Sequence, residues 1–348
     1  MEQKNLQGIT IFRFVAAFYV FIFHLNLRFP IEFPSILNKF IGNGAAGMTF
    51  FFVLSGFVMA WSSKSGIREH YFKARFLRIY PAYLLMGAIS LPLILDIELY
   101  KIPPSIILFT TGMQSFIPSS FSLWNFGGSW SVSTELFFYM VFPFLYPIIK
   151  KHPVASLALS YIISSLIVPF AYIIGGDSAF PYYYVSPMHR LPEFAAGVSV
   201  GVLYSAGRLK ISSGIIKISL SIVSILLLTF VSTFHNSGYM NCNFSTVLAT
   251  MILILVMANT RVNNGFLTTP LIYLGKISYS FYLMQIPLLM YVEKNKNSLD
   301  MFSSSHMWII LGVINVALAA LSFHLVEERF SLKKPKLDAM NNGDISTS

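Results

Sequence analysis

Charged residues and cysteine are both scarce in this chain of 348 residues. Only 11% of the residues are Asp, Glu, Lys or Arg, whereas 55% are hydrophobic and the mean hydropathy is +0.66. A soluble domain carries about 25% charged residues, so the composition excludes a water-soluble globule, and a disordered or collagen-like chain as well. The single cysteine, Cys242, excludes an internal disulfide framework and a cysteine-rich metal site. The sequence therefore predicts an all-α polytopic membrane protein.

Signals of several other classes are also missing. The first apolar run, Ile9 to Leu27, is too long for the hydrophobic region of a signal peptide, and no small-residue cleavage site follows it. No Walker loop, Rossmann fingerprint or Gly-X-Ser-X-Gly elbow occurs. The histidines show no metal-ligand spacing, so we expect no metal. The net charge of +10 fits the basic cytoplasmic loops of a membrane protein better than a nucleic-acid partner.

Apolar stretches of roughly 20 residues, the length that crosses a bilayer, predict about ten transmembrane helices. An eleventh stretch, 104–118, is short, bounded by prolines and partly polar, so we expect a short re-entrant segment there. The ten spans are 8–27, 44–62, 77–96, 130–149, 153–175, 186–206, 213–234, 244–260, 274–293 and 306–327.

The distribution of Lys and Arg predicts the orientation, because cytoplasmic loops are enriched in these residues. With both termini cytoplasmic and 104–118 not crossing, 17 of them lie inside and 6 outside. If 104–118 crosses, the numbers become 9 and 14, which favours the ten-span topology. We expect one membrane domain over residues 1–330 and a short polar cytoplasmic tail, 331–348. No internal repeat is visible, which weakens the interpretation as an inverted-repeat transporter.

Two ionisable residues, Arg13 and His24, lie within the first span, where charge is costly and often marks function. Their separation is about 1100° of helical rotation, which places them within about 20° of one face and about 16 Å apart along the axis. Arg13 lies in the inner half and only partly reaches the interface. His24 lies near the outer end, where an interfacial histidine in contact with water is the alternative interpretation.

A basic segment, Tyr71 to Tyr83, contains Lys73, Arg75 and Arg78 ahead of the span that begins near residue 77. One interpretation is an ordinary positive-inside anchor. The other is a binding site for a cytoplasmic ligand with phosphate groups. Arg75 and Arg78 share a helix face, and the arginine fork matches phosphate geometry.

A polar stripe enters the span 130–149 from the outside. Ser131, Glu135 and Tyr139 follow an i, i+4, i+8 spacing on one helix face. A carboxylate about one turn inside the apolar region has to be neutralised or paired. Glu135 is therefore either a site carboxylate or half of a structural pair with an arginine.

Two further polar sets have sufficient structural explanations. Arg190 and Glu193 stand at i, i+3, a spacing that allows an ion pair. Tyr279, Tyr282 and Gln285 lie on one side of the span 274–293, as in interfacial aromatic packing.

Taken in order, these segments resemble the membrane acyltransferase-3 family, bacterial integral-membrane proteins that O-acylate glycans and some small molecules. The resemblance covers roughly residues 6 to 330, and its specificity comes from the joint order of motifs that are weak singly. The motifs are Arg13-Phe-Val-Ala-Ala with His24, Phe51-Phe-Val-Leu-Ser-Gly-Phe57, Arg75-Phe-Leu-Arg-Ile-Tyr-Pro81, Trp130-Ser-Val-Ser-Thr-Glu135 with Phe138-Tyr139, Arg190-Leu-Pro-Glu-Phe194 with Gly197, and Leu274-Gly-Lys-Ile-Ser-Tyr-Ser-Phe-Tyr-Leu283.

The resemblance implies a multi-pass O-acyltransferase of the bacterial cytoplasmic (inner) membrane. Such a protein takes an acyl group, usually acetyl, from cytoplasmic acyl-CoA and places it on a hydroxyl at or beyond the outer face, with no permanently bound cofactor. The acceptor that it implies is a cell-surface polysaccharide or its lipid-linked precursor, such as O-antigen or exopolysaccharide. A macrolide-like acceptor and a succinyl donor stay open, as does the oligomeric state.

The mechanism that we expect is direct transfer. His24 acts as general base on the acceptor hydroxyl, and Arg13 stabilises the oxyanion or the amide groups of the donor. A covalent acyl-histidine is the variant that stays open. Arg75, Arg78 and Lys73 bind CoA phosphates. Glu135 orients the acceptor or a basic partner. The remaining residues expected on the acceptor side or in support are Trp130, Ser131, Tyr139, Arg190, Glu193 and Tyr282.

Two departures limit what the resemblance carries over. Gln285 stands where many members have a histidine, so no role is transferred to it. The hydrolase-like domain that some members append is missing, so we expect the membrane domain or a separate partner to complete the transfer. A transporter of acyl groups or glycans also fits the intramembrane charges, whereas a non-catalytic assembly protein fits them least.

Overall fold

The computed structural model describes residues 6–94, 97–121, 123, 129–176, 181–231, 243–295 and 302–330, and every regular element in these ranges is a helix. The predicted tail, 331–348, lies outside the described residues. The longer helices are α1 (Gln7–Arg28), α3 (Gly47–Ser62), α4 (Tyr71–Ile94), α5 (Ile102–Thr111), α6 (Ser129–Lys151), α7 (Pro153–Gly175), α9 (Pro187–Ser205), α10 (Gly214–Leu226), α11 (Asn243–Ala258), α12 (Thr268–Lys294) and α13 (Ser304–Ser322). The short ones are α2 (Ser35–Gly42), η1 (Gly44–Ala46), η2 (Leu99–Lys101), η3 (Gln114–Phe116), η4 (Pro118–Ser120), α8 (Tyr182–Val185), α14 (Glu328–Phe330) and the π-helical turns η6 (Leu227–Val231) and η8 (Phe323–Glu327).

Helices of membrane-spanning length and composition confirm a polytopic all-α membrane protein. Within the described residues there are seven of them. The predicted spans 186–206, 244–260 and 274–293 coincide with α9, α11 and α12. The seven candidates are Gln7–Arg28, Ser35–Ser62, Tyr71–Leu93, Ser129–Lys151, Pro153–Gly175, Gly214–Val231 and Ser304–Phe330.

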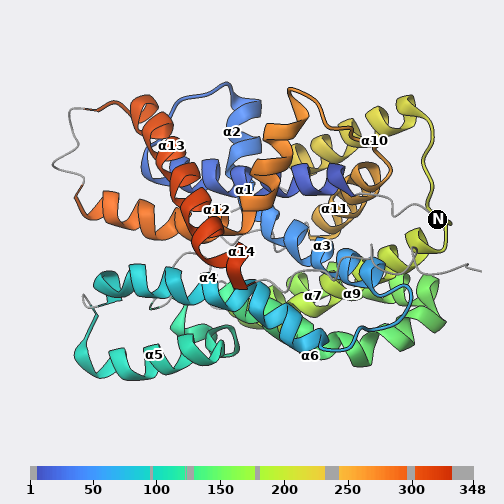
Figure 1. Ribbon diagram of the computed structural model, residues 1–348, viewed down its shortest axis with the longest axis horizontal. Coiled ribbons are helices and arrows are strands. Elements are labelled where there is room, and N and C mark those ends of the chain that lie inside the picture. Colours follow the sequence, from blue (N-terminus) through green and yellow to red (C-terminus); the bar gives the residue numbers. More distant parts are fainter. Residues whose placement is uncertain are drawn as a thin grey trace, which may run out of the picture.

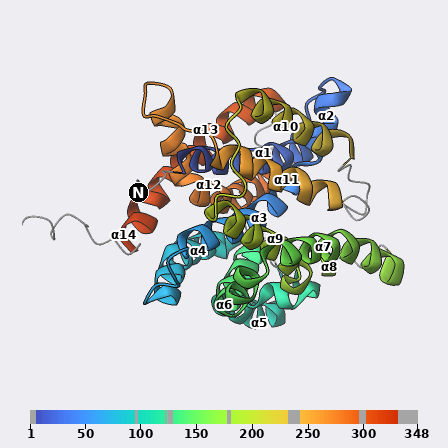
Figure 2. The same cartoon turned by 90° about the vertical axis from the view of Figure 1, so that its right-hand side faces the viewer.

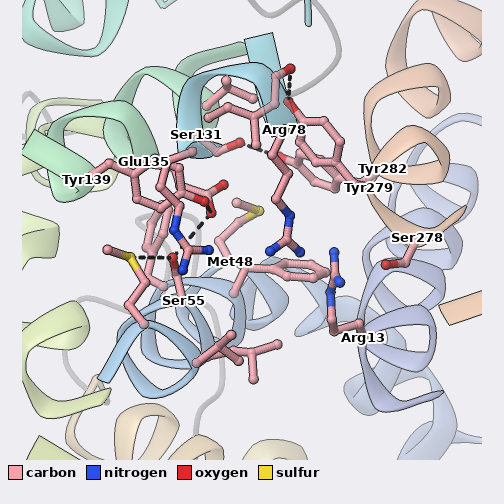
Figure 3. Close-up of a pocket in the computed structure, with 18 residues that line it drawn as sticks. Arg13, Met48, Ser55, Arg78, Ser131, Glu135, Tyr139, Ser278, Tyr279 and Tyr282 are labelled. Atoms are coloured by element: carbon pink, nitrogen blue, oxygen red, sulfur yellow. Dashed lines mark hydrogen bonds between the residues drawn. The ribbon is translucent and has the colours of Figure 1, made fainter. Parts of the chain in front are cut away.

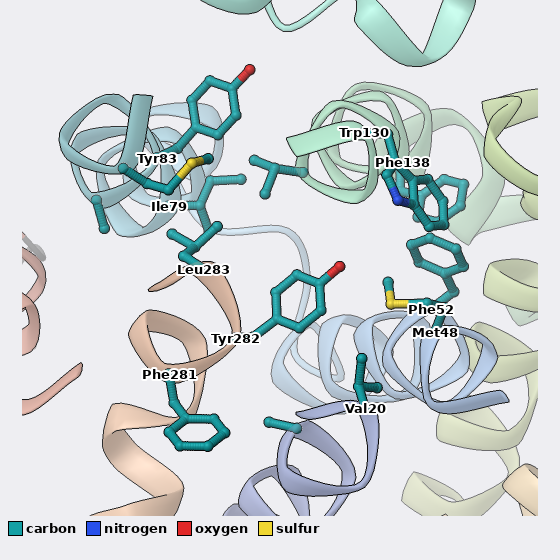
Figure 4. Close-up of a cluster of buried hydrophobic side chains, with 14 of the residues drawn as sticks. Val20, Met48, Phe52, Ile79, Tyr83, Trp130, Phe138, Phe281, Tyr282 and Leu283 are labelled. Atoms are coloured by element: carbon teal, nitrogen blue, oxygen red, sulfur yellow. The ribbon is translucent and has the colours of Figure 1, made fainter. Parts of the chain in front are cut away.

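The helices form two groups with α3 between them, as both views show (Figures 1 and 2). One group contains α4, α5, α6, α7 and α9, and the other contains α1, α2, α10, α11, α12 and α13. In the first group α9 packs against α3 and α7, and in the second α12 packs against α1 and α13. Buried apolar side chains from both groups belong to one cluster (Figure 4). Phe138 of α6 packs 5.3 Å from Phe52 of α3, and Phe281 of α12 packs 5.3 Å from Phe21 of α1.

Helix α4 includes the basic segment ahead of the predicted span. We expected the span to begin near residue 77 with the basic cluster ahead of it, but the helix already begins at Tyr71. The guanidinium of Arg75 explains the difference, because it donates to the Ser62 hydroxyl at 3.1 Å and lies 5.9 Å from the ring centres of Tyr71 and Tyr139. These contacts hold the basic segment against α3 and α6 as a regular helix.

Helices α4 and α12 run in the same direction. The Tyr279 hydroxyl donates to the carbonyl of Ile79, and the Tyr291 hydroxyl donates to the carbonyl of Ile89, both at 2.9 Å. The residue numbers therefore rise in the same direction along both helices, so the two helices are parallel.

Helix α1 is parallel to α12 too. A side chain at Gly275 would come within 2.0 Å of the carbonyl oxygen of Thr10, so only glycine permits this backbone approach. At the other ends of the same helices, Arg28 Nε lies 2.9 Å from a carboxylate oxygen of Glu293.

The segment 104–118 packs beside the middle of α4. Helix α5 has 10 residues, which is about 15 Å, half the thickness of a bilayer core. Beyond it, the Gln114 amide donates to the Tyr83 hydroxyl at 2.6 Å and to the carbonyl of Ser129 at 2.8 Å. The segment thereby joins the middle of α4 to the first residue of α6.

Candidate functional site

A pocket lies between the two helix groups and is lined from α1, α3, α4, α6 and α12 (Figure 3). Its lining includes seven of the residues predicted from the sequence. Arg78 is exposed at one end, whereas Ser131 and Tyr282 are buried at the other. The pocket therefore opens at the basic start of α4 and closes in the interior. The seven residues are Arg13, Arg75, Arg78, Ser131, Glu135, Tyr139 and Tyr282.

Arg13 and Arg78 face each other across this pocket. Figure 3 shows Arg13 extending from α1 and Arg78 from α4, with their guanidinium groups pointing towards one another. Neither group has an ion pair or hydrogen bond with the described part of the chain, although their charges interact. Two like charges held together in this way form a site for an anion with several acceptor oxygens.

The Glu135 carboxylate is held by hydroxyl groups from two helices. Its Oε1 accepts a hydrogen bond from Tyr139 at 2.5 Å and one from Ser55 at 3.2 Å. The alternative of a structural Glu135–arginine ion pair is not realised among the described residues; Arg13 interacts with this carboxylate only at longer range. The stripe of Ser131, Glu135 and Tyr139 lines one pocket, as its spacing predicts.

The buried end of the pocket is closed by a contact between α6 and α12. The hydroxyl oxygens of Ser131 and Tyr282 are 3.0 Å apart, and the ring of Phe51 packs 5.8 Å from that of Tyr282. Trp130 lies next to this contact but is not part of the lining. Its buried indole packs 6.0 Å from the ring of Phe52, so it supports the wall.

His24 and Lys73 do not line the pocket. His24 lies further along α1, about 16 Å from Arg13 in the axial direction. Its ring packs 5.1 Å from that of Phe23. Lys73 is exposed in the first turn of α4. The structure thus separates the predicted general base from the arginines on the same helix.

Arg190 and Glu193 form a second, fully buried polar cluster. Their ion pair measures 2.7 Å, and both side chains are 1% exposed. The carboxylate also accepts from Thr49 at 3.4 Å and from Asn243 at 3.3 Å. The pair predicted from the i, i+3 spacing is therefore present, and it ties α9 to α3 and α11. It lies behind the pocket wall, because the Arg190 guanidinium is 5.4 Å from the ring centre of Phe52, a lining residue.

Several residues near the pocket were not predicted as site residues. Ser55, Met48 and Ser278 line it, and so does Tyr279, which the sequence suggested only as interfacial packing. Glu327 accepts a hydrogen bond from Ser280, directly after Tyr279 on α12. An acidic residue at the very end of the last apolar run is the one sequence signal for Glu327. No group of three or more His, Cys, Asp or Glu side chains suited to a metal occurs in the described ranges.

Comparison with known proteins gives a match to one protein family and to several relatives. The acyltransferase domain family matches residues 6–324. Acyltransferase MdmB of Streptomyces mycarofaciens is 25% identical over 323 residues, covering 82% of this chain and 80% of that protein. O-acetyltransferase OatA of Staphylococcus aureus is 23% identical over 93% of this chain, which spans 57% of the length of OatA. A putative O-acetyltransferase of Staphylococcus aureus strain COL is 23% identical over 98% of this chain and 59% of its own length. No solved structure gives a significant match.

Proposed function

The chain belongs to this acyltransferase family, and we propose that it transfers an acyl group, acetyl in the first instance, from cytoplasmic acyl-CoA to an acceptor hydroxyl on the outer side of the bacterial inner membrane. The facing pair of Arg13 and Arg78 is the observation that carries the proposal. Within the described ranges these two guanidinium groups make no ion pair or hydrogen bond, and such groups at the open end of a pocket favour an anionic ligand. The phosphate groups of CoA supply several charges.

The shape of the pocket fits an elongated donor. Its wall on α3 runs from Met59 to Met48, which is about 16 Å at the rise of a helix. Between these ends the wall is largely apolar. We assign the phosphates to Arg75 and Arg78 and the pantetheine arm to the path along α3. The thioester then lies towards Ser131 and Tyr282.

The transfer itself is the nucleophilic attack of the acceptor oxygen on the thioester carbonyl. The new C–O ester bond forms, the C–S bond breaks, and CoA leaves as a thiol after taking up the proton from the acceptor hydroxyl. His24 receives this proton first as general base. Since Arg13 faces Arg78, we assign Arg13 to the donor anion and its amide groups rather than to the oxyanion. Glu135, held by Tyr139 and Ser55, orients the groups around the thioester.

The topology that we propose has ten crossings, both termini in the cytoplasm and 104–118 as a re-entrant segment. The parallel directions of α1, α4 and α12 support it, because the predicted spans that they contain all run from inside to outside. The short α5, docked beside the middle of α4, supports it too. In this orientation the exposed Arg78 faces the cytoplasm, where acyl-CoA is made available.

For the acceptor we propose a cell-surface polysaccharide or its lipid-linked precursor, such as O-antigen or exopolysaccharide. The O-acetyltransferase names of the Staphylococcus relatives support an O-linked acetyl product. The relative from Streptomyces is named only as an acyltransferase, so its name does not favour a glycan. A macrolide-like acceptor, which the family resemblance left open, is the second candidate.

The test is to supply acetyl-CoA, radiolabelled in the acetyl group, to membranes that contain the protein and to extract the surface glycans. We expect label in a glycan fraction, released as acetate by mild alkali as for an ester. Matched membranes with an Arg78→Ala variant serve as the control. Labelled acetate that crosses the membrane without ester formation would indicate the transporter instead.

A further inference from the structure

Glu327 lies next to the α12 wall of the pocket, on an element that the sequence did not connect with the site. It ends the π-helical turn η8, which continues α13 and packs against α4. Its carboxylate accepts a hydrogen bond from Ser280 of α12. Ser278 and Tyr279, just before Ser280, line the pocket. A π-helical turn often marks a functional position within a helix.

The charge of Glu327 acts on the pocket. The turn that carries it packs against α4, the helix of Arg78, and its carboxylate interacts electrostatically with both Arg13 and Arg78. Glu135, the carboxylate of the pocket lining, already accepts hydrogen bonds from Tyr139 and Ser55. Glu135 also acts on Arg13, and Glu327 acts on both arginines, so Glu327 is placed to balance the arginine pair while no ligand is bound.

Building on the proposed CoA site, we propose that Glu327 is the internal counter-charge of the donor pocket and competes with the phosphate groups of CoA for Arg13 and Arg78. Carboxylate and phosphate bind the same guanidinium fork, so the presence of one weakens the binding of the other. The product CoA carries the same phosphates as the donor. Glu327 thus limits the affinity for both and favours product release.

The Glu327→Gln substitution tests the negative charge of Glu327 separately from its hydrogen bond with Ser280. The amide oxygen of glutamine still accepts the hydrogen bond from Ser280, whereas the negative charge is gone. We expect CoA to bind the purified, detergent-solubilised variant about 3- to 10-fold more tightly than the wild type, as for one partly screened charge at close range. In acyl transfer, KM for acetyl-CoA and kcat are expected to fall together, because tighter CoA leaves more slowly.

Glu328→Gln is the matched control. It makes the same change of charge one residue further on, in an exposed side chain whose carboxylate lies 2.9 Å from His324. CoA affinity should stay at the wild-type value. If Glu327→Gln does not fold, Ser280→Ala provides the second test: it removes the hydrogen bond that restrains the carboxylate, so we expect weaker CoA binding.

Unchanged or weaker CoA binding by a folded Glu327→Gln protein would contradict the proposal that Glu327 is the counter-charge. Tighter CoA binding by Ser280→Ala would contradict it as well. A wild-type protein that does not bind CoA at all gives a different result. It would remove the donor site itself, and with it the proposed function, so the two failures are distinguishable by isothermal titration of the wild type alone.

Discussion

The arginines of the pocket differ in the hydrogen bonds and ring contacts that their guanidinium groups make with the protein itself. Arg75 donates to Ser62 and stacks on two tyrosine rings, so part of its fork is engaged. Arg78 has no hydrogen bond or ion pair within the described ranges, and its fork faces Arg13. A ligand at this site can therefore bind the planar guanidinium group of Arg78 through its fork of N–H donors, and not through its positive charge alone.

Lysine is therefore a poor substitute at both positions, although it preserves the charge. Losing a charge-assisted hydrogen bond costs about 1.5–3 kcal/mol, so we expect Arg75→Lys and Arg78→Lys to bind acyl-CoA about 10- to 100-fold more weakly. The measurement is a titration of purified protein in detergent. Arg68→Lys, an exposed position just before α4, is the control with no expected effect. Wild-type affinity in both variants would return these arginines to the role of a positive-inside anchor.

The base is tested by His24→Ala. Because His24 makes no side-chain hydrogen bond within the described part of the chain, its loss should leave expression and membrane insertion near normal. Acyl transfer should be abolished, while CoA binding stays unchanged because the donor pocket does not include this residue. Transfer activity and CoA affinity are measured on the same preparation. His306→Ala, an exposed histidine on α13, should retain activity, and an active His24→Ala protein would remove His24 from the mechanism.

Helical spacing predicts faces, but it does not predict what each face meets. The i, i+4, i+8 stripe on α6 does line one pocket, because every residue of a stripe that short faces the same neighbours. Arg13 and His24 also share a face, yet they are about three turns apart, and only Arg13 reaches the pocket. The sequence shows Glu327 as an acid at the end of the last apolar run, but it does not place this residue near the pocket, since that depends on how the end of α13 packs against α12 and α4.

At the scale of elements, the contact between α3 and α9 depends on glycine. A side chain at Gly197 would come within 1.9 Å of the carbonyl oxygen of Val53, and one at Gly56 within 2.1 Å of the carbonyl oxygen of Phe194. Both obstacles are backbone atoms, which cannot swing away. Helix α3 also carries Met48, Ser55 and Phe52, so its position sets one wall of the pocket.

Gly197→Ala should separate these helices. Overpacking of this kind costs about 1–3 kcal/mol, so we expect a lower Tm in detergent together with weaker CoA binding. Gly214→Ala is the matched control, because a side chain at Gly214 meets nothing within 4 Å. Its Tm should stay the same or rise slightly through helix propensity. Equal Tm values for Gly197→Ala and the wild type would show that this contact has room to relax.

The length of the apolar runs predicts most of the helices. The prediction is less accurate where a helix contains polar or charged residues. The spans over 8–27, 153–175 and 306–327 match helices of spanning character almost residue for residue. Helix α9 is a helix too, but it buries the Arg190–Glu193 pair within the protein and meets no lipid there. The apolar span predicted from residue 77 is only part of α4, because hydropathy ignores the contacts that join the basic residues to the same helix.

At the scale of the whole molecule, the site lies where the two helix groups meet, with the donor end at the exposed start of α4 and His24 further along α1. Neither group alone contains both Arg13 and Arg78. The pocket is thus a product of the complete bundle, and acyl-CoA bound as we propose would bridge the groups. In the proposed orientation, the acyl group would travel from the cytoplasmic end towards the outer end without passing through lipid.

This route requires the proposed orientation, which reporter fusions test directly. Fusions after Lys151, Lys210 and Arg261 should all report a cytoplasmic position, because 104–118 does not cross and each residue follows an outside-to-inside span. All three are exposed in the structure, so a fusion there disturbs no packing. A fusion after Lys39, between the first two spans, should report the outer side and serves as the control. Outer positions at both Lys151 and Lys210 would mean that 104–118 crosses, and they would place the C-terminal half, with Tyr279 and Glu327, in the inverse orientation. Since α4 and α12 are parallel and share the pocket, that result would contradict the structure as well as the charge distribution.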